Sequence, residues 1–143
     1  MKRPPFTILA IFLSASVSFL FSGCAKPGAK VDVSAQITAL KSADKEARVN
    51  ACVELAKAGP KAASAVPALI PLLKDQDAEV RKLASYALYE IGPEAKAAIP
   101  AVKEQLNDPD RFVVSQAINT LRAIDPSAKD IPAPPNVTTG VKP

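Results

Sequence analysis

Residues 74–100, KDQDAEVRKLASYALYEIGPEAKAAIP, decide the fold, because most of their features recur one period earlier and one period later in the chain. Three sets of residues repeat at a constant spacing of 33 positions: Asp44, Asp77 and Asp110; Leu55, Leu88 and Leu121; Pro60, Pro93 and Pro126. A fixed period of about 20 to 50 residues is typical of solenoid proteins, in which each copy stacks on its neighbours. The sequence therefore predicts a repeat architecture with three copies.

Each copy contains a long amphipathic helix. In the first copy Ala47, Ala51, Leu55 and Ala58 follow one another at steps of four, four and three, and the equivalent positions of the other copies are also apolar. This spacing places them on one face of a helix. A glycine or an aspartate followed by proline comes next, and this pattern predicts the end of each helix, since proline cannot continue the hydrogen-bond ladder.

A shorter helical segment precedes each long one. The stretches VSAQITALKSAD, VPALIPLLKDQD and IPAVKEQLNDPD align at the same spacing, with apolar residues three or four positions apart. We therefore predict three helix pairs: residues 33–41 with 44–58, 66–74 with 77–91, and 99–107 with 110–124. Pro71 should kink its helix, because its ring removes a hydrogen bond. The connecting stretches GPKAASA and GPEAKAA are expected to form a helical turn each.

The second copy, VPALIPLLKDQDAEVRKLASYALYEIG at residues 66–92, resembles the HEAT-like repeat family, especially its short bacterial form. The resemblance covers residues 32–126 and implies an all-α fold, an α-solenoid of about three helix pairs. It also implies a ladder between neighbouring units, made by an aspartate at the turn between two helices and an arginine six residues later. The second copy has both residues, Asp75 and Arg81.

The other two copies depart from this pattern. The first has Ser42 with Arg48, and the third has Asp108 with Val114. We therefore expect at most a short ladder, drawn from Arg48, Asp75, Arg81 and Asp108, and outer units that are looser than the middle one. Ankyrin and tetratricopeptide repeats fit less well, because the T-P-L-H-x-A signature is absent and the chain has no Trp.

The N-terminal residues 1–23 have the pattern of a signal peptide. Lys2 and Arg3 precede the uncharged stretch FTILAIFLSASVSFLF, and small residues follow it. Sixteen residues make a helix of about 24 Å, shorter than the roughly 30 Å hydrocarbon core of a bilayer. Ser22, Gly23 and Cys24 resemble the bacterial lipoprotein box, which implies diacylation of Cys24 and anchoring in the cell envelope. The alternatives are ordinary cleavage after Ala25, giving a secreted soluble protein, and an uncleaved anchor.

The flanks of the repeat domain have a different composition. Residues 24–31 contain Pro27 and Gly28 and are expected to form a flexible tether. By analogy with sorting in bacteria that have two membranes, Ala25 after the cysteine favours the outer membrane. Residues 127–143 are rich in proline and poor in large apolar side chains, so we expect a disordered tail. Ile131 could still fold back over the exposed end of the third unit.

The residues needed for most catalytic chemistry are missing. The chain has no His, no cluster of Cys and no Gly-rich phosphate loop, so we expect no enzyme activity, no metal and no cofactor. Removing Lys2 and Arg3 with the signal peptide lowers the formal charge of +4 to +2, and the charges are well mixed, which argues against nucleic-acid binding. Cys52 is expected to be a structural, partly buried thiol.

Three aromatic residues remain outside the signal peptide, and all lie opposite the apolar face of their helices. In the HEAT-like family the outer face of the second helices lines the concave surface of the solenoid. Because aromatic and arginine side chains are typical of binding surfaces, we expect a partner-binding site there. Its candidate residues are Tyr86, Tyr89, Phe112, Lys82, Val49, Val53, Asn119 and Arg122.

The function we expect is that of a lipid-anchored scaffold, monomeric, that binds an as yet unknown protein partner. Two alternatives stay open. Some short-repeat relatives act in attaching bilin pigments to phycobiliproteins, which implies a lyase or a chromophore-handling enzyme, although export argues against this. The chain could instead be a passive structural module of the envelope, with Tyr86, Tyr89 and Phe112 only covering neighbouring units.

Overall fold

The computed structural model describes residues 31–127 and residue 131. The predicted signal peptide (1–23), the predicted lipidation site Cys24, and nearly all of the predicted tether and tail lie outside these residues. Between residues 31 and 127, none of the helices has the length and apolar character that crossing a lipid bilayer requires.

The described chain folds into three consecutive helix pairs. In the first unit α1 (Val33–Ala39) precedes α2 (Lys45–Ala58). In the second, α3 (Val66–Leu69) continues into the 3-10 helix η2 (Ile70–Lys74) and is followed by α4 (Ala78–Ile91). In the third, α5 (Ile99–Glu104) continues into η4 (Gln105–Asn107) before α6 (Arg111–Ile124). The 3-10 helices η1 (Gly59–Ala65) and η3 (Gly92–Ala98) connect the units.

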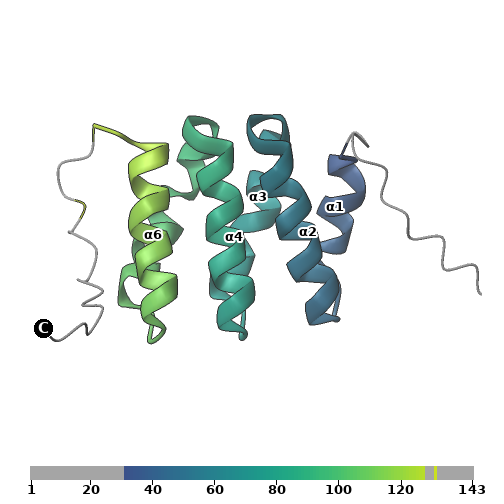
Figure 1. The fold of residues 1–143 in the computed structure, drawn as a ribbon, viewed down its shortest axis with the longest axis horizontal. Coiled ribbons are helices and arrows are strands. Elements are labelled where there is room, and N and C mark those ends of the chain that lie inside the picture. The colour runs from purple at the N-terminus through teal and green to yellow at the C-terminus, as the bar shows by residue number, and fades with distance from the viewer. Residues whose placement is uncertain (1–30, 128–130, 132–143) are drawn as a thin grey trace, which may run out of the picture.

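The second helices of the three units form one layer. Figure 1 shows α2, α4 and α6 side by side, with the shorter first helices behind them. Helix α4 packs against α2 on one side and against α6 on the other. The predicted all-α solenoid of three helix pairs is therefore confirmed, and the part of the chain from residue 31 to 127 contains no strand.

The three aspartates of the repeat begin the three long helices. The side chain of Asp44 accepts hydrogen bonds from the backbone N–H groups of Glu46 and Ala47, and Asp77 accepts one from Glu79. Asp110 accepts one from Phe112, at 2.7 Å. Each carboxylate thus satisfies N–H groups that the first helical turn leaves without a partner, and its charge lies at the positive end of the helix dipole.

The glycines of the repeat allow the chain to turn sharply after α2 and α4. Gly59 has a φ of 57° and Gly92 a φ of 72°, values that other residues adopt only with strain. The equivalent residue after α6 is Asp125, whose φ is −134°. The chain therefore leaves the third unit in a more extended conformation, without the turn that leads into another connector.

The first helix of the second unit changes type at Pro71, where the sequence predicted a kink. Helix α3 ends at Leu69, and the chain continues through Pro71 as the tighter helix η2. Proline has no N–H group to donate to the carbonyl four residues earlier, so the α-helical pattern cannot continue there. The third unit makes the change from α5 to η4 two positions later in the repeat, and there Glu104, at the position of Pro71, is still part of the α-helix.

The core is continuous through all three units. The alanines at the centre of the long helices, Ala51, Ala84 and Ala117, are almost completely buried, and so are the repeated leucines. Small side chains at these positions let neighbouring helices approach closely. Ile131 packs partly buried against the same core, as the sequence suggested.

Candidate functional site

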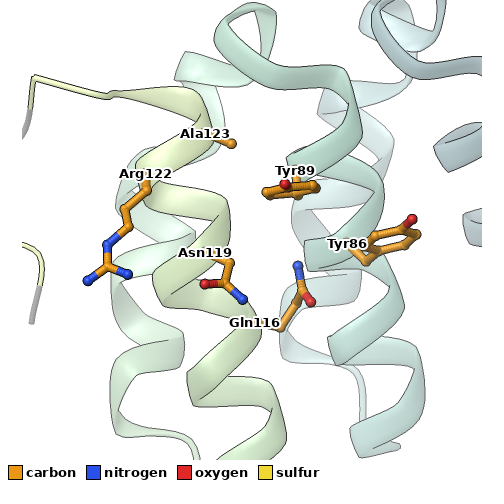
Figure 2. Close-up of a pocket in the computed structure, with 6 residues that line it drawn as sticks. All are labelled: Tyr86, Tyr89, Gln116, Asn119, Arg122 and Ala123. Carbon is orange, nitrogen blue, oxygen red and sulfur yellow. The ribbon is translucent and has the colours of Figure 1, made fainter. Parts of the chain in front are cut away.

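A hollow lies on the outer face of the layer, between α4 and α6. Its volume is about 620 Å³, and it is lined by Tyr86 and Tyr89 from α4 and by Gln116, Asn119, Arg122 and Ala123 from α6. Figure 2 shows the ring of Tyr89 and the amides of Gln116 and Asn119 turned toward the space between the two helices. The hollow therefore combines an aromatic wall with a wall of amide groups.

The two tyrosines form a stacked pair on the surface of α4. Their ring centroids are 6.1 Å apart and their planes differ by 14°. Positions 86 and 89 are three residues apart, so the two side chains lie on the same face of the helix. The two residues are 39% and 40% exposed, so the fold leaves a pair of large aromatic side chains accessible to solvent. A hydrogen bond with the carboxylate of Glu90 raises the pKa of the Tyr86 hydroxyl.

Buried hydroxyl groups join α4 to α6 beside the hollow. The hydroxyl oxygens of Ser85 and Thr120 are 3.2 Å apart, and Thr120 also donates to the carbonyl oxygen of Ser85 at 2.9 Å. Both side chains are fully buried. Gln116 donates from Nε2 to the Thr120 hydroxyl at 3.3 Å, which fixes one lining residue to this network. The spacing of the two helices under the hollow is therefore held by specific hydrogen bonds.

The structure brings four of the eight predicted binding residues together. Tyr86, Tyr89, Asn119 and Arg122 line the hollow, whereas Lys82, Phe112, Val49 and Val53 do not. Phe112 is 58% exposed, with the guanidinium of Arg111 at 5.0 Å from its ring centroid. Val49 is half-buried and packs against the core. The binding role of all eight residues remains a prediction.

The sequence reasoning missed Gln116 and Ala123. Both lie on the same face of α6 as Asn119, three residues before it and four residues after it. This spacing was visible in the sequence. Neither residue is an aromatic or an arginine, the side-chain types that indicated the binding surface in the sequence.

The ladder joins both pairs of neighbouring units. Arg48 donates from Nη2 to Oδ1 of Asp75 in the next unit at 3.2 Å, and its Nε lies 2.9 Å from Oδ2. Arg81 makes the equivalent contacts with Asp108. The four residues predicted for the ladder therefore form it, but each arginine pairs with the aspartate of the following unit, so that each of the two interfaces has a rung.

Cys52 is completely buried rather than partly buried as expected. It is a free thiol, and burial, together with the nearby negative charge of Asp75, raises its pKa to about 12. A thiol in this environment stays protonated at neutral pH and is a poor nucleophile. The residues that the structure describes also include no group of three or more His, Cys, Asp or Glu side chains arranged to hold a metal ion.

Comparison with known proteins agrees with the fold. A family model described as HEAT repeats matches residues 33–122. Two crystal structures of engineered proteins from the Northeast Structural Genomics Consortium are similar to the chain, with 28% and 30% identity and TM-scores of 0.57 and 0.56. Each alignment covers 64% of this chain, which spans 44% of the first engineered protein and 27% of the second. No curated protein matches the sequence.

Proposed function

The chain belongs to the HEAT-repeat family, and from this premise we propose that it is a scaffold that binds a protein partner through the hollow between α4 and α6. HEAT repeats stack into extended surfaces that are typically used for binding rather than catalysis. The hollow lies on the layer that α2, α4 and α6 form side by side (Figure 1).

The exposed tyrosine pair is the observation that carries this proposal. Tyr86 and Tyr89 are the two large apolar side chains of α4 that the fold leaves exposed, and they share one wall of the hollow. Tyrosine contributes strongly to protein interfaces, because it offers a large rigid surface together with a hydroxyl group. The amides of Gln116 and Asn119 on the opposite wall supply hydrogen-bonding groups that can orient a bound chain.

The proposal includes a lipid anchor on Cys24. The uncharged stretch before Ser22-Gly23-Cys24 supports export, and residues 24–31 would then tether the repeat domain close to the membrane of the cell envelope, with the outer membrane favoured. Intact mass of the N-terminal peptide tests this, since diacylation adds the mass of the lipid. A Cys24→Ser variant should lose the added mass and leave the detergent phase in a partitioning experiment. An unmodified Cys24 in the native protein would contradict the anchor.

Partner binding is tested by crosslinking in cells followed by capture of the tagged protein. We expect the wild-type chain to capture a partner that Tyr86→Ala/Tyr89→Ala does not. Phe112→Ala is the matched control, because Phe112 is also an exposed aromatic residue but lies outside the hollow. Circular dichroism should show that both variants are folded. A folded double variant that captures the same partner at the wild-type level would refute this use of the hollow and favour a passive structural module.

A further inference from the structure

We propose that the hollow between α4 and α6 is a docking site for the chain's own proline-rich C-terminal segment, residues 132–143. The docked segment is part of the same molecule, so its binding to the hollow does not depend on any external partner. Only the expected competition between the segment and a bound protein rests on the function proposed above.

The chemistry of the segment suits the walls of the hollow. The segment begins Pro132-Ala133-Pro134-Pro135. Proline-rich stretches favour the polyproline II conformation, which has no internal hydrogen bonds and leaves its carbonyl oxygens free to accept them. Domains that bind such stretches use exposed aromatic rings as a platform for the proline rings, with side-chain donors for the carbonyl oxygens.

The hollow presents both of these elements. The ring of Tyr89 lies on the α6 side of the stacked pair, with the amides of Gln116 and Asn119 across the space from it, and the ring of Tyr86 extends the aromatic surface on the side away from α6 (Figure 2). Asn119 is exposed, and its amide makes no hydrogen bond to any other residue that the structure describes. Gln116 uses Nε2 toward Thr120, and that nitrogen has a second hydrogen to donate.

The position of the segment makes the contact reachable. Helix α6 ends at Ile124, and Asn119 lies five residues earlier, about 8 Å back along the helix axis. Ile131 packs against the core, so the segment starts next to the repeat domain. The twelve residues 132–143 reach about 37 Å in the polyproline II conformation, which is long compared with the roughly 8 Å of helix between Asn119 and Ile124.

Covalent connection favours this occupant over a free peptide of the same sequence. A short linker gives an effective concentration on the order of millimolar, so even a weak contact is substantially occupied. An external protein that uses the hollow must then displace the segment. If the function proposed above is correct, loss of the three prolines strengthens partner capture.

Photo-crosslinking in cells tests the inference on the full chain. We would replace Tyr89 by p-benzoyl-phenylalanine, which keeps an aromatic ring in the hollow, irradiate the cells and digest the purified protein with trypsin. The expected product is a species of monomer mass in which position 89 is linked to the tryptic peptide that begins at Asp130. The same photoreactive residue at position 112, exposed but outside the hollow, should not link to that peptide.

A second variant shows whether the prolines are responsible. Serine at positions 132, 134 and 135 should abolish the link from position 89, and because these residues follow the repeat domain, the helices should be unaffected. The inference is overturned if position 89 never links to the tail, if position 112 links to it equally, or if the link survives the triple substitution. The inference is also overturned if position 89 links only to another protein or only to a second copy of this chain. A link to another protein would nevertheless support the proposed scaffold function.

Discussion

Arg81 on α4 binds both carboxylate oxygens of Asp108 in the next unit. Its Nε donates to Oδ2 at 2.7 Å and its Nη2 donates to Oδ1 at 2.9 Å, while Nη1 donates to the carbonyl oxygen of Asp75 at 2.8 Å. Arg48 and Asp75 form the same ion pair at the first interface, at the same separation of 27 residues, but there only Nη2 donates a hydrogen bond and Nε, 2.9 Å from Oδ2, is not aligned for one. Each guanidinium thus ties the turn of its own unit to the carboxylate of the following one.

Substitution of Arg81 by methionine should destabilise the domain. The Arg81 and Asp108 side chains are 13% and 8% exposed, so the change leaves a mostly buried carboxylate without its cationic partner. We expect a loss of about 1–3 kcal/mol in the free energy of unfolding, measured by urea denaturation. Lys45→Met is the control, because Lys45 bridges Asp77 and Glu79 on the exposed surface and should barely change the midpoint. Equal midpoints for the two variants would contradict a structural role for the ladder.

The stability that Asp108 provides should depend on pH. Burial alone would raise the pKa of Asp108, but hydrogen bonds from Arg81 and from the Asp110 N–H outweigh it and hold the pKa below the ordinary aspartate value. The unfolded chain therefore takes up this proton at a higher pH than the folded chain. The contribution is fully present above the ordinary pKa of about 3.9 and is lost as the pH falls through the lower folded value. Urea midpoints of wild type and Asp108→Asn should therefore differ most near neutral pH and converge in acid, whereas a constant difference would show that ionisation is irrelevant.

The sequence predicted the helix pairs well because their signals are local. Aspartate caps and a glycine followed by proline each constrain a few neighbouring residues, and the fixed period of 33 shows that these local signals recur in every copy. The residues of the ladder follow from the family resemblance, but their pairing could not be predicted in the same way, since the partners lie 27 residues apart in different units. When both partners are sought within one unit, Ser42 and Val114 look like defects. Both lie in the outer units, and the described residues contain no further unit that could pair with them.

Ser42 also retains part of the role of the missing aspartate. Its hydroxyl oxygen accepts the N–H of Asp44 at 3.1 Å, as Asp75 accepts that of Asp77 and Asp108 that of Asp110. The candidate site was predictable to a similar extent. Helical spacing placed Tyr86, Tyr89, Asn119 and Arg122 on one face, but only the packing of α4 against α6 decides which of these side chains share a hollow.

The thiols should report both burial and lipidation. Cys52 is buried with its pKa raised to about 12, so the folded protein at pH 8 should not react at this residue with Ellman's reagent. In guanidinium chloride the thiol becomes accessible and its pKa returns to about 8.5. A chain that keeps an unmodified Cys24 should then show two reactive thiols, whereas acylation of Cys24, or its removal by cleavage after Ala25, leaves one, and intact mass separates these two cases. Rapid labelling of Cys52 in the folded protein would contradict the packing of α2 against α4.

The hydroxyl pair beneath the hollow should couple α4 to α6 energetically. Thr120→Val removes the partner of the buried Ser85 hydroxyl, and the groups left unpaired should cost about 1–3 kcal/mol in unfolding free energy. Ser85→Ala/Thr120→Val removes both hydroxyls with little change of shape, so it should be more stable than the sum of the single changes predicts. A double-mutant cycle by urea denaturation measures this difference, for which contacting residues typically give about 0.5–3 kcal/mol. Strict additivity would mean that the two hydroxyls do not interact, and that apolar packing alone sets the spacing of the helices under the tyrosine pair.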